Sequence, residues 1–217
     1  MRDIRPYQIF TLLDAVPPER VAQVKIPNRR DLWLLETFIL ITAVRLVKAK
    51  RIFEFGTFFG STTLNLALNS PADAQIFTFD LPKADALAAT KNQPDFRVAG
   101  ERLNHAQPDF TGFGEAGKIK TLLGNSRDFD FSPFKNSMDM VFIDGGHDYE
   151  TVKSDTSNAL AMLKADAPGC IFWHDYQNIE CEENTRFLTE LEKDLSLFHV
   201  KETMLCGWFN EPSGIKL

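Results

Sequence analysis

Short apolar runs, which are typical of buried strands, alternate along this chain with longer runs of helical character. The first five strand-like runs are bounded by Gly, Pro or Asp: residues 51–55, 75–80, 118–123, 138–143 and 169–174. The helix-like runs are residues 61–68, 151–164 and 182–195. Two last strand-like runs, 196–203 and 205–210, have no helix between them. This order predicts an α/β fold with a doubly wound, mostly parallel seven-stranded sheet that ends in an antiparallel hairpin.

A long apolar run at residues 32–47 precedes the first predicted strand. Asp31 stands where it can cap a helix that runs to about Lys50. The run is shorter than the roughly 20 apolar residues that a membrane span needs, so we expect a buried helix and no membrane segment. Residues 1–30 hold four prolines and are expected to form an arm that is mostly loop, with a short helix near 7–13. The arm and the long helix are a candidate homodimer contact.

Length, charge and cysteine content restrict the function classes. A chain of 217 residues suffices for one domain, so residues 31–217 are expected to form a single unit. The net charge of −6 disfavours a nucleic-acid partner and favours a small-molecule substrate, because phosphate contacts usually need a basic face. Three cysteines without a Cys-x-x-Cys pair, and a start that lacks the features of a signal peptide, predict reduced thiols in a cytoplasmic protein.

The first predicted strand ends in a turn of the form Gly-x-x-x-Gly, at Gly56 and Gly60, directly before a helix. Glycine lets the backbone turn sharply and approach a ligand closely. The following helix presents free N–H groups and its positive dipole end to that ligand, and Ser61, Thr62 and Thr63 add hydroxyl donors. The spacing differs from Gly-x-Gly-x-x-Gly and so disfavours a nicotinamide dinucleotide.

Two acids belong to the first two predicted strands. Glu54 lies inside an apolar strand, and a buried carboxylate needs partners, which a cationic cofactor group or a turn at the strand end would supply. Asp80 ends the second strand, where an acid can accept two hydrogen bonds from a ribose diol or form a turn before Pro82. The glycine turn ahead of it favours the ribose.

Three segments carry a resemblance to a known family. The run Glu-Phe-Gly-Thr-Phe-Phe-Gly-Ser-Thr at 54–62 resembles motif I of class I S-adenosylmethionine (SAM)-dependent methyltransferases. The runs Phe-Ile-Asp-Gly-Gly-His-Asp-Tyr-Glu at 142–150 and Trp-His-Asp-Tyr at 173–176, with Asp155 between them, are similar to a group near the macrocin-type and catechol-type O-methyltransferases. The resemblance covers roughly residues 36–176. It implies a Rossmann-like methyltransferase fold, SAM as cofactor and methylation of a small hydroxylated molecule such as a sugar or a phenol.

The resemblance also implies cofactor contacts. Gly56, Thr57 and Gly60 would line the methionine part of SAM, Thr62 would hold its carboxylate, and Asp80 would bind the ribose hydroxyls.

Further cofactor contacts are expected beyond this turn. Phe58 lies in the turn and is a candidate to cover the ligand. Asn125 and Ser126 follow the third strand, where the family places its adenine contacts. Members of the family often have Asp at the position of Asn125, and an amide can also bond the adenine edge.

Asp144, His147, His174 and Asp175 follow two consecutive predicted strands. Asp and His side chains close together suggest a divalent metal, and the resemblance makes Asp144, His174 and Asp175 its candidate ligands, with Asp144 also beside the cofactor. His174 stands where the family commonly has an acid, and Mg²⁺ prefers oxygen ligands, which leaves a softer metal or none. Asp144 and His147 are the candidate catalytic residues. His147 is predicted to act as the base, because an ordinary histidine titrates near neutral pH, or else to be a turn residue.

Residues 82–117 form the least regular segment, and we expect either a surface excursion or a lid over the substrate. Three alternatives to methyl transfer onto a small molecule stay open. A SAM-binding protein without transfer fits the imperfect metal set. An NAD(P)-dependent oxidoreductase is disfavoured by the glycine spacing. An RNA methyltransferase is disfavoured by the acidic pI of about 5.3.

Overall fold

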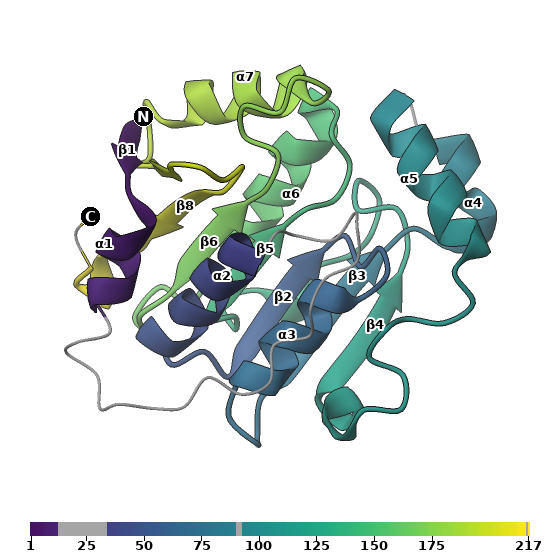
Figure 1. Cartoon of the computed structure of the whole chain (residues 1–217), viewed down its shortest axis with the longest axis horizontal. Helices are drawn as coiled ribbons and strands as arrows, with labels where there is room; N and C mark the ends of the chain where they lie inside the picture. Colours follow the sequence, from purple (N-terminus) through teal and green to yellow (C-terminus); the bar gives the residue numbers. More distant parts are fainter. Residues whose placement is uncertain (13–33, 90–92, 216) are drawn as a thin grey trace.

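The computed structural model describes residues 1–12, 34–89, 93–215 and 217. Its centre is one mixed sheet with the strand order β1-β7-β8-β6-β5-β2-β3-β4 (Figure 1). The strands have these bounds: β1 Arg2–Ile4, β2 Arg51–Phe55, β3 Gln75–Asp80, β4 Ile119–Leu123, β5 Met140–Ile143, β6 Cys170–Trp173, β7 Phe198–Val200 and β8 Cys206–Phe209. The strands β6, β5, β2, β3 and β4 are mutually parallel, whereas β8 runs antiparallel to both β6 and β7.

Helices cover both faces of this sheet. The α-helices have these bounds: α1 Pro6–Thr11, α2 Leu34–Leu46, α3 Ser61–Asn69, α4 Lys83–Ala89, α5 Gln93–Asn104, α6 Tyr149–Met162 and α7 Glu182–Leu191. Short 3-10 helices are Gly114–Lys118, Ser132–Phe134 and Glu211–Ser213. Helices α1, α2 and α3 pack on one face and α6 and α7 on the other, whereas α4 and α5 lie beyond the ends of β3 and β4 (Figure 1).

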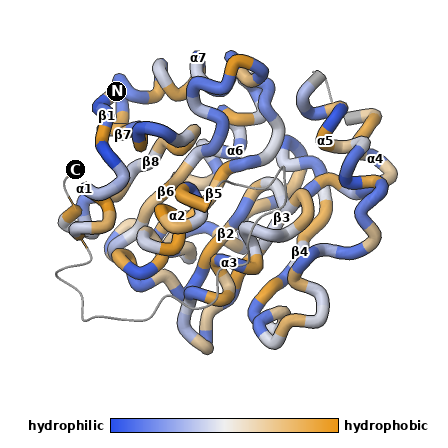
Figure 2. The backbone as a smooth tube through the Cα atoms, viewed as in Figure 1, coloured by the Kyte–Doolittle hydropathy of each residue, from blue (hydrophilic) through white to orange (hydrophobic). Residues whose placement is uncertain are grey.

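The alternation of side chains along the strands explains the two cores. In β2, Ile52 faces α2 and α3, while Phe53 and Phe55 face α6, because successive strand residues point to opposite faces. The ring of Phe53 meets Phe131 edge-on, and the ring of Phe55 meets both Phe79 and Phe131 edge-on. Figure 2 shows that the central strands and α2 are largely hydrophobic, as expected of strands that are covered on both faces.

The sequence predictions of fold class and of most elements are confirmed. β2 and β3 have the predicted bounds, and the other predicted strands are shorter at one or both ends. The last two strands form the expected antiparallel hairpin. The helix predicted from Asp31 begins by Leu34 among the described residues and ends at Leu46, and Asp31 itself lies outside them.

Two predictions need correction. The sheet has eight strands rather than seven, because β1 pairs in parallel with β7, so the first residues of the expected arm belong to the sheet. Residues 82–117 are also not the least regular part of the fold, since they hold α4 and α5. α5 was missed because Pro94 and a largely polar sequence hide its pattern. None of the described helices is long and apolar enough to cross a membrane.

Candidate active site

A pocket of about 750 Å³ lies at the carboxyl ends of the parallel strands. The chain adds β3 and β4 on one side of β2 and then adds β5 and β6 on its other side, so the order of strands in the sheet reverses between β2 and β5. Ligands of open α/β sheets bind at such a switch point. One end of the pocket is formed after β2, β3 and β4 and is called the cofactor end below. The other is formed after β5 and β6 and is called the acid–histidine end.

The glycine turn brings these two ends together. Gly56 has a φ of 93°, and a Cβ atom there would lie 1.9 Å from the carbonyl oxygen of Asp144. Gly60 has a φ of 85°, precedes α3, and has the ring of Phe110 against it. Only glycine fits the Gly56 position, because a side chain would need both a strained backbone and space that β5 occupies.

Asp80 holds the same turn through its side chain. One carboxylate oxygen accepts hydrogen bonds from the backbone N–H groups of Thr57 and Phe58, at 3.2 and 3.0 Å. The other accepts from the N–H of Leu81 and from Arg102 Nη1, at 2.7 and 2.9 Å. Burial raises the pKa of Asp80, and the charge of Arg102 opposes that rise. Its oxygens are thus fully engaged here, and a ribose would have to replace Arg102.

Glu54 differs from the prediction. It is buried away from the pocket and accepts hydrogen bonds from the hydroxyls of Thr63 and Thr78. Burial raises the pKa of Glu54 to about 8, against the effect of these two bonds. The partner predicted to be a cationic cofactor group is therefore a pair of threonines.

The predicted cofactor residues divide into two sets. Six line the pocket: Gly56, Phe58, Asp80, Asn125, Ser126 and Asp144. Four do not: Glu54, Thr57, Gly60 and Thr62. The residues of the second set support the turn on the side away from the pocket. For example, the hydroxyl of Thr57 lies 2.7 Å from that of Thr78.

Asp155 of α6 was not predicted to line the cofactor end. It is 1% exposed, and its Oδ1 has no hydrogen-bond partner among the described residues. Burial raises the pKa of Asp155 to about 7, against a hydrogen bond from Ser126. The signal was present in the sequence, because Asp155 interrupts the buried stripe of α6 that includes Val152 and Ala159.

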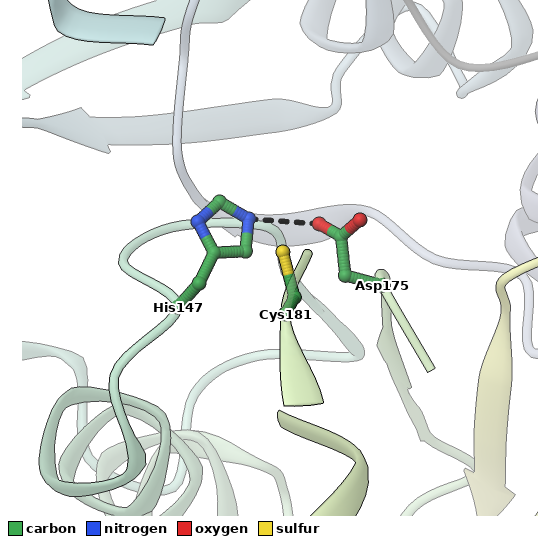
Figure 3. A group of neighbouring side chains, drawn as sticks. All are labelled: His147, Asp175 and Cys181. Atoms are coloured by element: carbon green, nitrogen blue, oxygen red, sulfur yellow. Dashed lines mark hydrogen bonds and ion pairs between the residues drawn. The ribbon is translucent and has the colours of Figure 1, made fainter. Parts of the chain in front are cut away.

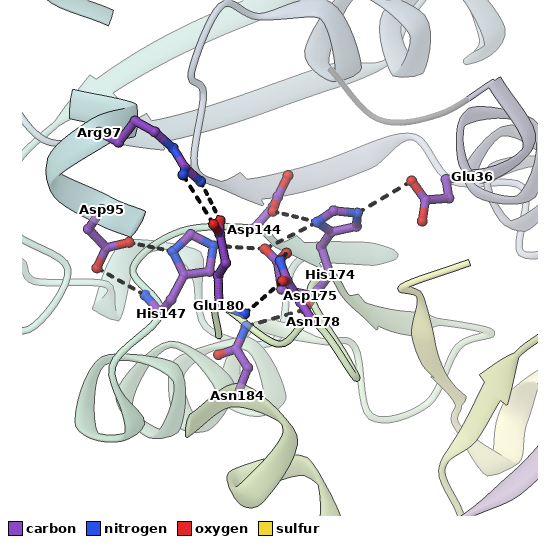
Figure 4. Close-up of polar contacts among 10 residues, drawn as sticks. All are labelled: Glu36, Asp95, Arg97, Asp144, His147, His174, Asp175, Asn178, Glu180 and Asn184. Atoms are coloured by element: carbon purple, nitrogen blue, oxygen red, sulfur yellow. Dashed lines mark hydrogen bonds and ion pairs between the residues drawn. The ribbon is translucent and has the colours of Figure 1, made fainter. Parts of the chain in front are cut away.

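The acid–histidine end brings together all four residues predicted there. His147 Nε2 donates to Asp175 Oδ2 at 2.8 Å, and the thiol of Cys181 lies beside this pair (Figure 3). His174 Nδ1 lies 3.2 Å from Asp144 Oδ1 and 3.2 Å from Asp175 Oδ2 (Figure 4). Asp175 thus joins the two histidines through one oxygen.

Two acids from distant elements complete this end. Asp95 of α5 bonds Nδ1 of His147, and Glu36 of α2 lies 3.3 Å from Nε2 of His174 (Figure 4). Glu36 also accepts from the backbone N–H of Met204 at 2.8 Å. A charge within an apolar helix was a sequence signal for Glu36, whereas nothing in the sequence marked Asp95.

The electrostatics of this end weigh against the prediction that His147 acts as the base. Burial opposes a charged ring, but hydrogen bonds to Asp175 and Asp95 raise the pKa of His147 to about 10. Burial likewise opposes charge on His174, but Asp144 and Asp175 raise the pKa of that ring well above its usual value. A raised pKa favours the imidazolium form of each ring at neutral pH, which weighs against either ring as the general base.

The two carboxylates between the rings differ from each other. Burial would raise the pKa of Asp175, but His174 and His147 hold that pKa well below its usual value. For Asp144, burial dominates and raises the pKa in spite of His174. Asp144 is also the more open of the two, with 26% of its side chain exposed against 10% for Asp175. Asp144 is therefore the carboxylate of this pair that is more open to the pocket.

Helix α5 lies at the rim of the pocket and is held there by three side-chain contacts. Asp95 bonds His147, Arg102 bonds Asp80, and Arg97 forms a two-point ion pair with Glu180. These contacts join both ends of the pocket to one helix. The helix therefore stands where the predicted lid was expected, and whether it moves stays a prediction.

Comparisons with known proteins agree with this architecture. A family model described as a methyltransferase domain matches residues 53–176. The O-methyltransferase TomG from Streptomyces achromogenes, a protein of tomaymycin synthesis solved in complex with SAM, is 15% identical over 94% of this chain and 88% of its own, with a TM-score of 0.54. An O-methyltransferase from Bacillus cereus, solved with SAH, is 15% identical over 93% of this chain and 96% of its own, with a TM-score of 0.54.

A third solved structure, the O-methyltransferase NovP, is 14% identical over 80% of this chain and 77% of its own, with a TM-score of 0.57. At these identities the likeness shows the fold. No curated protein resembles the chain closely enough to count as a match. The family model covers more than half of the 217 residues and includes Gly56, Asp80, Asp144 and Asp175, so the chain belongs to the methyltransferase domain family.

Proposed function

We propose that this protein is a SAM-dependent O-methyltransferase that acts on a small hydroxylated molecule. The observation that carries the proposal is the single pocket that joins the glycine turn and Asp80 to Asp144 and the two histidines. A methyl donor at the first end and a hydroxyl at the second would meet beside Asp144. The O-methyltransferases of similar fold, two of them solved with SAM or SAH, support the choice of cofactor.

SAM would lie with its methionine part against the Gly56 turn and its adenine toward Asn125 and Ser126. Its ribose hydroxyls would bond Asp80 in place of Arg102. Since Arg102 belongs to α5, cofactor binding would be coupled to a shift of that helix.

In the proposed reaction, the acceptor oxygen attacks the methyl carbon of SAM, the new C–O bond forms, and the C–S bond breaks to leave S-adenosylhomocysteine. Asp144 takes the hydroxyl proton, because burial raises the pKa of this exposed-edge carboxylate and so makes it a stronger base than an ordinary aspartate. The imidazolium rings of His147 and His174 stabilise the negative charge that develops on the acceptor oxygen.

A divalent metal held by Asp144, His174 and Asp175 is part of the proposal. The ligand atoms of these residues lie within 4.8 Å of one another. The separations of 3.2 Å suit neighbouring ligands of one ion, since bonds of about 2.1 Å place ligand atoms roughly 3.0–3.4 Å apart. The nitrogen ligand fits a transition metal better than Mg²⁺, and the ion would take the place of a proton on His174. With the ion bound, only His147 would keep the imidazolium role. A bound metal would lower the pKa of the acceptor hydroxyl.

Two measurements test the proposal. Calorimetry should show binding of SAM and of S-adenosylhomocysteine but not of NAD. A panel of catechols, phenols and sugars incubated with SAM should yield S-adenosylhomocysteine together with a methylated acceptor. Binding of NAD alone would overturn the proposed cofactor.

The same panel distinguishes this proposal from its alternative, a SAM-binding protein that transfers no methyl group. That alternative is favoured by the carboxylates around both histidines, which raise the pKa of each ring and so weaken it as a base for methyl transfer. Tight SAM binding with no methylated product from any hydroxylated acceptor class would support it and overturn the O-methyltransferase proposal.

A further inference from the structure

Cys181 contributes a sulfur atom to the acid–histidine end of the pocket. Its Sγ, His147 Nε2 and a carboxylate oxygen of Asp175 all lie within 4.8 Å of one another (Figure 3). All three residues line the pocket, and Cys181 is 4% exposed. The residue precedes α7, and its thiol makes no capping hydrogen bond to that helix and no disulfide. Sulfur, imidazole nitrogen and carboxylate oxygen are the three ligand types of protein zinc sites.

Neighbouring residues orient two of these three side chains. Asp95 bonds Nδ1 of His147, which turns Nε2 toward Asp175 and Cys181. Asn178 donates to Asp175 Oδ1 at 2.5 Å, which leaves Oδ2 for the cluster (Figure 4). A carboxylate behind a histidine and a hydrogen bond behind a carboxylate are the supports that metal-binding residues usually have.

A metal ion would bind His147 through a ring nitrogen without a proton and Cys181 through its thiolate, so the protons that these two atoms carry would leave to solvent.

We propose that His147, Asp175 and Cys181 bind a divalent transition-metal ion of the Zn²⁺ class, with a fourth coordination position open to the pocket. A thiolate ligand selects such an ion over Mg²⁺. The site is distinct from the Asp144–His174–Asp175 set, although Asp175 belongs to both. The proposal goes beyond the proposed methyl transfer and does not depend on it. With the ion bound, His147 would be a neutral ligand rather than an imidazolium ion.

Cobalt absorption tests the site, because Co²⁺ replaces Zn²⁺ and absorbs in the near ultraviolet when a thiolate binds it. The full chain, freed of metal with a chelator, is titrated with Co²⁺. We expect a sulfur-to-cobalt charge-transfer band that saturates with the ion at this site and disappears when Zn²⁺ is added. A folded wild-type chain without this band overturns the proposal.

Cysteine variants assign the band. Cys181→Ser should lose it and should bind Zn²⁺ about tenfold or more weakly by calorimetry. The matched control is the double variant Cys170→Ser/Cys206→Ser, since both of these thiols are buried in the sheet away from the pocket. That variant should keep the band. If Cys181→Ser fails to fold by circular dichroism, the double variant still decides, because Cys181 is then its only cysteine.

Two further variants separate this site from its neighbour. Asp144→Asn should keep the cobalt band, whereas loss of the band would assign the sulfur-bound ion to the other set and overturn the proposal. Asp95→Asn should keep the band but weaken binding about 10–100-fold, as removal of a carboxylate behind a histidine does. Unchanged affinity in Asp95→Asn would contradict the orienting role given to Asp95.

Discussion

The two ends of the pocket are built in different ways. At the cofactor end, backbone groups and short side chains predominate: the Gly56 turn, the N–H groups that bond Asp80, and the hydroxyls that donate to Glu54. At the acid–histidine end, charged side chains from four different elements or loops meet, with Asp175 between two imidazolium rings. Local sequence determines the backbone geometry of the cofactor end, whereas tertiary contacts determine which charges meet at the acid–histidine end.

This contrast implies that the two ends should fail in different ways. Substitutions at the cofactor end should disturb backbone geometry, and therefore both stability and cofactor affinity. Substitutions at the acid–histidine end should alter proton transfer and leave stability and cofactor affinity unchanged.

Gly56→Ala should have the largest effect. The new Cβ would overlap the carbonyl oxygen of Asp144 and would hold a positive φ, so we expect a loss of roughly 2–4 kcal/mol in the free energy of unfolding. SAM affinity should fall with it. Urea unfolding and calorimetry measure the two effects.

The control for this change is Gly114→Ala. A Cβ at Gly114 meets no atom within 4 Å, so both quantities should stay near those of the wild type. Equal effects at Gly56 and Gly114 would contradict the close packing of the turn against β5.

Asp144→Asn should lower turnover about 10²–10⁴-fold, the range expected when a general base is removed, while SAM affinity changes little. Asp80→Asn should show the reverse, with weaker SAM binding and a smaller change in turnover at saturating SAM. Steady-state kinetics and calorimetry on both variants distinguish the ends. If Asp144→Asn and Asp80→Asn changed turnover and SAM affinity in the same way, the two ends would not have separate roles.

Glu54→Gln should change the pH dependence of stability. The pKa of Glu54 is about 8 in the folded protein against 4.5 ordinarily, so between these values the folded state binds more protons than the unfolded state. Stability therefore falls as pH rises through this window, by at most about 1.4 kcal/mol per pH unit from this group.

The measurement is urea unfolding of both proteins at pH 5 and pH 8. The wild type should lose more stability between these two values than Glu54→Gln does, and the difference between the variants cancels the contribution of His147 and other groups. Parallel pH profiles would show that Glu54 is not protonated in the folded protein.

Arg97→Ala should have the smallest effect on stability. The pair with Glu180 is about half exposed, and exposed ion pairs contribute less than about 1 kcal/mol. If α5 is a lid, the variant should nevertheless release SAM faster, which stopped-flow fluorescence can follow. Lys50→Ala breaks the exposed Lys50–Asp73 pair far from the pocket and should leave the release rate unchanged.

Much of the cofactor end was predictable because its residues are close in sequence. Strand, glycine turn and helix follow one another within 51–69, and short apolar runs predict both β2 and β3. The partners of Glu54 were not predictable, because Thr63 and Thr78 come into reach only when α3 packs on β2 and β3 pairs with it.

The sequence by itself determined the fold class, the order of the five central parallel strands along the chain, and the positions of Gly56, Asp80, Asp144 and Asp175 at strand ends. The tertiary structure alone decided that carboxylates raise the pKa of His147 and of His174, and that Asp95, Glu36 and Cys181 lie beside these rings. The physical reason is range: periodicity and turn chemistry act over a few neighbouring residues, whereas a pKa depends on every charge within several ångströms, whatever its position in the chain.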